Sequence, residues 1–213
     1  MNKGTLNQLF FTTVERHADL PFAFRSKVAG MWVPIRHREA SQRVQAISLG
    51  LRELGVQPGD RVAIVSENRP EWALTDYACL AARAADVPIY PTLTPKQTEY
   101  ILHDSESVVV CCSTDAQVAK VLDVRSGLPG LKHVIAFDAS VRREGVLTLA
   151  EVEAKGRAAI GKYPDWTPQL ALELMDSHGI EVRKHALAFH IADEIGIDRR
   201  NPSEYPRHTA GFP

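Results

Sequence analysis

The chain has 213 residues, and its 25 lysines and arginines against 26 aspartates and glutamates give a formal net charge of −1. This length corresponds to about one to one and a half domains. The balanced charge excludes a nucleic-acid binder that works by neutralising phosphates, and the 45% hydrophobic content excludes a chain disordered throughout. No uncharged apolar run is long enough for a membrane span, and no signal peptide is evident, so we expect a cytoplasmic protein.

The first quarter of the chain predicts a helix, a hairpin and a longer helix. Apolar side chains recur at helical spacing over residues 5–18, which indicates an amphipathic helix. Extended runs over 22–26 and 31–35 flank a short turn and predict a hairpin. A second helix is expected over 38–54, because Gly55 follows its apolar stripe as a typical C-terminal stop.

Beyond residue 60, short apolar runs alternate with helical segments. The expected strands are 61–66, 87–90, 108–112 and 133–137. The expected helices are 70–85, 94–103, 115–125 and 148–160. The apolar runs lack two-fold alternation, which is typical of strands covered on both faces, and strand–helix alternation predicts parallel crossovers. We therefore expect an α/β fold with a doubly wound, mainly parallel sheet over 60–160, and the first helix and hairpin packed on its edge or face.

The composition changes after Tyr163, where prolines punctuate the chain. Two further helices are plausible at 168–177 and 182–195, followed by a frayed end. We expect a domain over 1–166 and a separate helical tail over 167–213. Apolar residues make this tail amphipathic enough to cover exposed sheet surface. They are Leu170, Leu172, Leu174, Leu187, Phe189, Ile191 and Ile195.

One segment nearly matches a phosphate-binding loop. Gly156 to Lys162 fits G-x-x-x-x-G-K, but Tyr163 stands where a metal-binding hydroxyl is needed. The preceding residues 151–155 read as an exposed helix rather than a strand, so we expect no phosphate site here.

The remaining polar residues predict no catalytic centre. His178 and His185 are separated by Gly179, and His185 and His190 do not converge on one helix face, so we expect no metal site. The carboxylates near element ends are expected to be solvated surface groups, and they are Asp104, Glu106 and Asp115. The three cysteines give neither a disulfide framework nor a Cys-x-x-Cys site, and we expect them in the core; they are Cys79, Cys111 and Cys112.

Three blocks in the same order carry a family resemblance. They are Pro58–Trp72 (PGDRVAIVSENRPEW), Val87–Pro95 (VPIYPTLTP) and Glu99–Ser105 (EYILHDS). Over residues 3–166 the chain resembles the N-terminal part of AMP-forming acyl-CoA synthetases of the long-chain fatty acid type. The glycine that the family has before its Val-Pro-Ile-Tyr strand is missing, and Ala84-Ala85-Asp86 stands there instead.

The resemblance implies a two-step reaction in which ATP and a fatty acid give an acyl-adenylate, and coenzyme A then takes the acyl group. Such chemistry needs a phosphate loop, a Mg²⁺-binding acid, a ribose-binding Asp and a late Lys. None of these motifs is present, and the sequence from Thr167 onward matches nothing in the family. No catalytic or cofactor-binding residue can therefore be carried over, and ATP, Mg²⁺ and CoA are expected only for the complete enzyme.

Two readings remain open. In the first, the chain is a truncated or split fatty acid–CoA ligase, inactive alone, whose missing motifs come from a second chain. In the second, it is a non-catalytic interaction module with residues 167–213 as its partner-binding part. A homo-oligomer is compatible with either reading.

Overall fold

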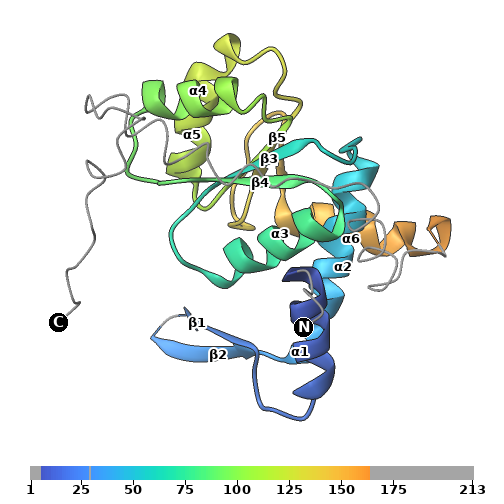
Figure 1. The fold of residues 1–213 in the computed structure, drawn as a ribbon. Coiled ribbons are helices and arrows are strands. Elements are labelled where there is room, and N and C mark those ends of the chain that lie inside the picture. Colours follow the sequence, from blue (N-terminus) through green and yellow to red (C-terminus); the bar gives the residue numbers. More distant parts are fainter. Residues whose placement is uncertain (1–5, 29, 164–213) are drawn as a thin grey trace, which may run out of the picture. The chain divides into compact units, whose positions relative to one another are not determined.

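A computed structural model describes residues 6–28 and 30–163 (Figure 1). The N-terminal elements are α1 (Leu6–Arg16), β1 (Phe24–Val28), β2 (Met31–Ile35) and α2 (His37–Glu53). The elements that follow are β3 (Arg61–Val65), α3 (Pro70–Ala81), β4 (Ala85–Ile89), α4 (Pro95–Asp104), β5 (Val109–Cys112), α5 (Asp115–Val124), η1 (Arg125–Gly127), β6 (His133–Ala136), β7 (Val146–Thr148), α6 (Leu149–Ala159) and η2 (Ile160–Lys162). The expected tail helices and the histidines beyond residue 163 lie outside the described residues.

The central sheet has five parallel strands in the order β4-β3-β5-β6-β7. The expected doubly wound parallel α/β fold is thus confirmed, and β7 is added to the four predicted strands. β7 is absent from the predicted strands because it has only three residues, of which two are half-buried. So short a run carries no apolar signature.

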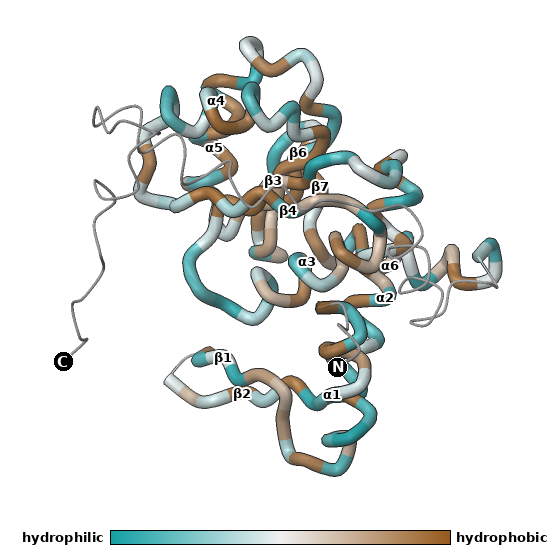
Figure 2. Tube along the Cα trace, viewed as in Figure 1, coloured by the Kyte–Doolittle hydropathy of each residue, from teal (hydrophilic) through white to brown (hydrophobic). Residues whose placement is uncertain are grey.

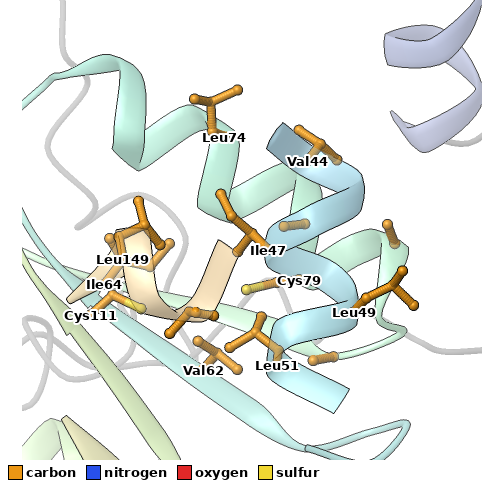
Figure 3. Close-up of a cluster of buried hydrophobic side chains, with 14 of the residues drawn as sticks. Val44, Ile47, Leu49, Leu51, Val62, Ile64, Leu74, Cys79, Cys111 and Leu149 are labelled. Carbon is orange, nitrogen blue, oxygen red and sulfur yellow. The ribbon is translucent and has the colours of Figure 1, made fainter. Parts of the chain in front are cut away.

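Helices cover both faces of this sheet, and successive strand residues point to opposite layers. Val62 and Ile64 pack with α1, α2, α3 and α6 in one apolar cluster, whereas Ala63 and Val65 pack with α4 and α5 in another. Figure 3 shows residues of the first cluster, and in Figure 2 the region of the central strands is largely brown, the colour of hydrophobic residues. Burial on both faces explains the unbroken apolar runs of the sequence.

The three cysteines lie in this core, as expected. Cys79 and Cys111 belong to one cluster and Cys112 to the other, and all three are free and buried. Burial raises the pKa of the Cys111 thiol to about 12. These thiols are therefore core residues rather than nucleophiles.

The helices α2 and α6 pack unusually closely. A Cβ at Gly156 of α6 would overlap the backbone of Ala46, and a Cβ at Gly50 of α2 would overlap the backbone of Val152. Two helices can approach this closely only where glycine leaves room for the facing backbone. The glycine that begins the G-x-x-x-x-G-K segment is thus a packing residue in the middle of a helix.

The first helix and the hairpin lie against the helical layer. α1 packs against α2 and α3, where Phe10 stacks on Tyr77 with 4.2 Å between ring centroids. The root of the hairpin is anchored by Ile35, which is buried in the same apolar cluster. These elements were expected on the edge or face of the α/β layer, and their main described contacts are with the helices of that layer.

The end of α3 differs from the prediction. The helix stops at Ala81 instead of residue 85, because Arg83 adopts a left-handed φ of 62° and β4 already begins at Ala85. This turn lies directly before Ala84-Ala85-Asp86, where the family's glycine is missing. An arginine here takes a conformation that glycine adopts without steric cost.

Other local predictions hold. Pro70 is the first residue of α3, and Thr94 caps α4 by accepting a hydrogen bond from the backbone N–H of Gln97. Among the described residues, no helix has the length and apolar character required to cross a membrane.

Candidate functional site at the carboxyl edge of the sheet

The carboxyl ends of the five parallel strands place their following loops at one edge. In open α/β sheets, ligands bind at this edge, where the strand order reverses. Here the reversal falls between β3 and β5, because α3 leads outward to β4 and the chain then returns to β5 on the other side of β3. Residues 66–69 follow β3, and Ser113 follows β5.

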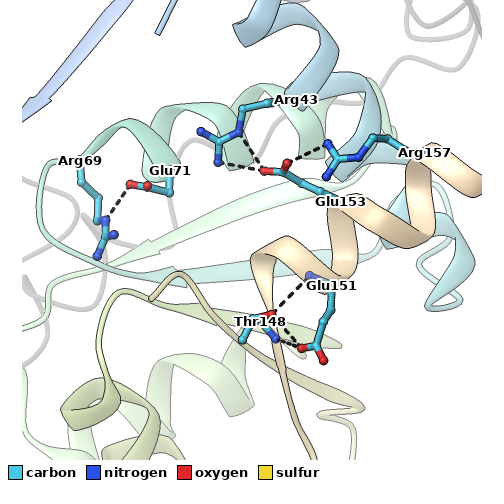
Figure 4. A network of polar contacts seen from close by, with 7 residues as sticks. All are labelled: Arg43, Arg69, Glu71, Thr148, Glu151, Glu153 and Arg157. Carbon is cyan, nitrogen blue, oxygen red and sulfur yellow. Dashed lines mark hydrogen bonds and ion pairs between the residues drawn. The ribbon is translucent and has the colours of Figure 1, made fainter. Parts of the chain in front are cut away.

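Arg69 joins three of these loops. Its Nε donates to Glu71 at 2.8 Å, and its Nη1 donates to the backbone carbonyl of Ser113 at 3.0 Å and to Asp138 at 2.9 Å. The guanidinium also lies 5.7 Å from the ring centroid of Phe137. The segments after β3, β5 and β6 are therefore connected through one side chain, and Figure 4 shows Arg69 with its contact to Glu71.

The electrostatics of this cluster favour its charged form. Burial of Arg69 opposes its charge, but the hydrogen bonds and charges of Glu71 and Asp138 outweigh it and raise the pKa of the guanidinium. Burial likewise opposes the charge of Glu71, and the hydrogen bond from Arg69 reverses the effect and lowers the pKa of that carboxyl. Arg69 is thus a fixed cation whose donors are largely used within the protein.

A second contact fixes the loop after β4. Lys120 of α5 donates from Nζ to the carbonyl of Pro91 at 2.7 Å, and Gln117 donates to the same oxygen at 3.2 Å. Burial lowers the pKa of Lys120, although the nearby charge of Glu67 partly opposes this. The loop that ends the Val87–Pro95 block is therefore held against α5.

A hollow of about 780 Å³ lies between the hairpin and the segment that follows β3. Its walls are Phe24–Val28 and Trp32 on the hairpin and Glu67–Glu71 on the other side. This volume falls within the range of small-molecule sites, and the lining mixes cations, carboxylates and aromatic rings. Arg69 and Glu71 face it while paired with each other.

The residues of the phosphate-loop match are not brought together as a cradle. Gly156 lies inside α6, whereas Gly161 and Lys162 lie in η2, with no strand before them. Lys162 donates to Glu53 at 2.6 Å, which lowers the pKa of that carboxyl. The absence of a phosphate site at this segment stays a prediction.

The same helix corrects one expectation. Residues 151–155 are helical as predicted, but they are not all exposed, because Val152 and Glu153 are buried. Glu153 accepts hydrogen bonds from Arg43 at 2.9 Å and from Arg157 at 3.1 Å (Figure 4). The two guanidiniums offset the free-energy cost of burying the Glu153 carboxylate. The sequence pattern alone does not reveal these two partners.

Asp115 and Glu106, which were expected to be merely solvated, each form an ion pair with an arginine. Asp115 forms a bidentate pair with Arg143 at 2.6 and 2.7 Å, and this hydrogen bonding lowers the pKa of the Asp115 carboxyl. Glu106 pairs with Arg61. Both carboxylates are surface groups, but they tie separate segments together instead of being merely solvated.

A carboxylate pair that the sequence analysis misses joins α3 to β4. Burial, followed by the charge of Asp86, raises the pKa of Asp76 to about 7, and burial also raises the pKa of Asp86. Two carboxyl groups this close share a proton more readily than they both ionise. Only the crossing of α3 over β4 brings them together, so their spacing in the sequence carries no signal.

Comparison with known proteins agrees with this fold and places it in a family. The family model described as AMP-binding enzyme matches residues 10–184, most of the chain. The chain belongs to the AMP-binding enzyme family. The match extends beyond residue 166, where the sequence analysis places a domain boundary, and that boundary stays a prediction.

Among curated members of this family, the chain is 39% identical over 117 residues to a long-chain-fatty-acid–CoA ligase, FadD15, of Mycobacterium bovis, covering 55% of this chain and 20% of the relative. It is 28% identical over 154 residues to the long-chain-fatty-acid–CoA ligase ACSBG1 of Bos taurus, covering 71% of this chain and 21% of the relative. The chain thus spans about a fifth of the length of these relatives.

Solved structures share the fold. A putative long-chain-fatty-acid CoA ligase from Rhodopseudomonas palustris superposes with a TM-score of 0.56 at 27% identity, covering 70% of this chain and 36% of that one. The A-PCP didomain of a carboxylic acid reductase from Segniliparus rugosus, in complex with AMP, superposes with a TM-score of 0.63 at 19% identity, covering 74% and 27%. The second likeness concerns the fold alone.

Proposed function

We propose that this chain forms the opening part of the catalytic domain of a fatty acid–CoA ligase. The complete enzyme would convert ATP, a fatty acid and CoA into acyl-CoA, AMP and pyrophosphate. The observation that carries the proposal is the AMP-binding family match over residues 10–184, supported by 39% identity to a long-chain-fatty-acid–CoA ligase. Residues 1–166 would form the partial AMP-binding domain, and 167–213 a separate tail.

The described residues do not fit the phosphates of ATP or their Mg²⁺. Arg69 is engaged by Glu71, Ser113 and Asp138, and Lys162 is engaged by Glu53. Within residues 6–28 and 30–163, no cluster of three or more metal-type side chains is found. The proposal therefore assigns the phosphate and metal contacts to residues that a second chain or a longer chain supplies.

The role of the described part would be to build and fix the carboxyl edge of the sheet. Arg69 connects the loops after β3, β5 and β6, and Lys120 fixes the loop after β4. Rigid support from such side chains is what an adjoining site needs, because a misplacement of about 1 Å can cost on the order of 10²-fold in rate. Alone, this part is expected to be inactive.

A non-catalytic interaction module is the second candidate. The exposed apolar end of the β1–β2 hairpin favours it, because exposed apolar patches mark interaction surfaces. The two candidates differ in whether the described residues can substitute for their counterpart in an active ligase.

A chimera tests the proposal. Residues 6–163 of this chain would replace the corresponding segment of the mycobacterial relative FadD15, and acyl-CoA formation from a long-chain fatty acid would be measured. The proposal predicts an active chimera, and a matched chimera carrying Arg69→Ala should show a lower kcat. A folded chimera without any ligase activity would favour the interaction module.

A further inference from the structure

The hollow beside the β1–β2 hairpin has two cations on its hairpin wall. Arg25 and Lys27 occupy alternate positions of β1 and so share one face, and both line the hollow. Trp32 lies across from Lys27 on the same wall and is 61% exposed. Among the ion pairs of residues 6–28 and 30–163, none involves Arg25 or Lys27. This wall therefore combines uncompensated positive charge with an exposed aromatic ring.

The carboxylates on the opposite wall have cations of their own. Glu71 pairs with Arg69 at 2.8 Å. Glu67 lies close enough to Lys120 for its charge to oppose the lowering of the Lys120 pKa by burial. An occupant of the hollow thus meets free positive charge on one wall and compensated negative charge on the other. This arrangement favours an acidic occupant that also carries apolar side chains for Trp32.

The chain itself continues into a segment of this chemistry. Residues 164–180 contain Asp165, Glu173 and Asp176 but no lysine or arginine. The large apolar residues of the same segment are Trp166, Leu170, Leu172, Leu174, Met175 and Ile180. By contrast, residues 20–36 of the hairpin region contain basic residues and no acidic one. The two segments are therefore complementary in charge.

The chain is long enough for the acidic segment to arrive at the hairpin. Tyr163 donates from Oη to Glu53 at 3.0 Å, and Glu53 is the last residue of α2. The hairpin leads into the other end of α2, which has 17 residues and is about 25 Å long. Residues 164–172 span up to about 30 Å when extended. Glu173 and Asp176 consequently lie within reach of β1.

We propose that residues 164–180 of this chain occupy the hollow and close it to other ligands. Glu173 and Asp176 pair with Arg25 and Lys27, and the neighbouring leucines cover the ring of Trp32. Each exposed ion pair of this kind strengthens binding by only up to about fivefold, which is little for a free peptide. A tethered segment needs no more, because a short linker gives it an effective concentration in the millimolar range. The proposal goes beyond the ligase function and does not depend on it.

Zero-length cross-linking of the full chain with a water-soluble carbodiimide tests the occupant. The reagent joins a lysine amine to a carboxylate only where the two groups are in contact, and mass spectrometry of the digest identifies the pair. We expect Lys27 to be joined to Glu173 or Asp176 within one chain, with a yield that falls as the salt concentration rises. Lys96, an exposed lysine of α4, is the internal control and should not be joined to these two acids.

A variant that keeps the cross-linking groups tests the charge pairing. Arg25→Gln should lower the yield at Lys27 about two- to fivefold, because it removes one of the two ion pairs. The matched control is Arg38→Gln, at an exposed arginine of α2, and it should leave the yield unchanged. Circular dichroism establishes that both variants are folded.

Three results would overturn the proposal. Lys27 joined only to Glu67 or Glu71 would show that the acidic segment does not lie in the hollow. Products that join ¹⁵N-labelled to unlabelled chains in a mixture would assign the occupant to a second copy. Equal yields at Lys27 and Lys96, or an unchanged yield in Arg25→Gln, would remove the charge complementarity on which the proposal rests.

Discussion

Replacing Gly156 by alanine tests the close contact of α2 and α6. In an exposed helix this change would stabilise by roughly 0.5–1 kcal/mol, because alanine is the better helix former. Here the new Cβ would lie 2.7 Å from Gly50 N and closer still to the carbonyl oxygen of Ala46, whereas ordinary contact begins at 3.4 Å. Both neighbours are backbone atoms of a helix, so they cannot rotate away.

The two helices must therefore move apart, which disturbs a core that includes Val152 and Ile47, both fully buried. Overpacking of this kind costs about 1–3 kcal/mol and occasionally more. We expect a cost at the upper end of this range and, after subtracting the gain in helix propensity, a net loss of about 1–2.5 kcal/mol in the free energy of unfolding, which lowers Tm by about 2–10 °C for a chain of this size.

Urea denaturation followed by circular dichroism measures the loss, with Gly161→Ala as the matched control. Gly161 has no atom within 4 Å of its would-be Cβ, so this substitution should change stability by less than about 0.5 kcal/mol. If Gly156→Ala is as stable as the parent chain or more stable, the close packing of α2 and α6 is refuted.

Three further changes give expected outcomes of known sign. Arg83→Gly should raise stability by about 0.5–1 kcal/mol in thermal unfolding, because it relieves the left-handed φ of 62°, and Arg83→Ala, which keeps that φ, should bring no gain. The raised pKa of Asp76, about 7, means that between about pH 4 and pH 7 the folded chain keeps a proton that the unfolded chain releases. The contribution of Asp76 to the free energy of unfolding is therefore fully present below about pH 4 and is lost as the pH rises to 7. In urea titrations, the free energy of unfolding of Asp76→Asn should therefore equal that of the parent near pH 4 and exceed it by about 1–3 kcal/mol at pH 8. If the difference between variant and parent is the same at both pH values, the shared proton is contradicted. Glu153→Ala should cost about 3 kcal/mol, since it leaves an arginine of the α2–α6 contact without its counter-ion, whereas Arg157→Ala on the exposed side should cost less than about 1 kcal/mol in the same assay.

The parallel sheet could be predicted from the sequence because its strands are buried on both faces. The apolar runs that became β3 and β5 needed no knowledge of their neighbours. The end of α3 could not be placed, because the alanine-rich residues 81–85 favour a helix locally, while pairing with β3 draws Ala85 into β4. Tertiary pairing overrides local propensity at such a boundary.

The contacts of the candidate site could not be predicted from the sequence, because they join residues that are far apart along the chain. Arg69 and Asp138 are 69 residues apart, and only the order of strands in the sheet brings them together. Glu153 was expected to be exposed because a charged residue on a helix usually is, and its partner Arg43 is 110 residues away. The family resemblance, by contrast, rested on contiguous blocks and could be recognised directly.

The most direct test of the proposed ligase function is fatty-acid-dependent exchange of labelled pyrophosphate into ATP. The exchange would be measured for this chain alone, for a FadD15 chain lacking the segment that corresponds to residues 6–163, and for the two mixed. The account predicts no exchange by either chain alone and exchange by the mixture. Clear exchange by this chain alone would contradict it, because the proposal assigns the phosphate contacts to residues outside the described part of the chain.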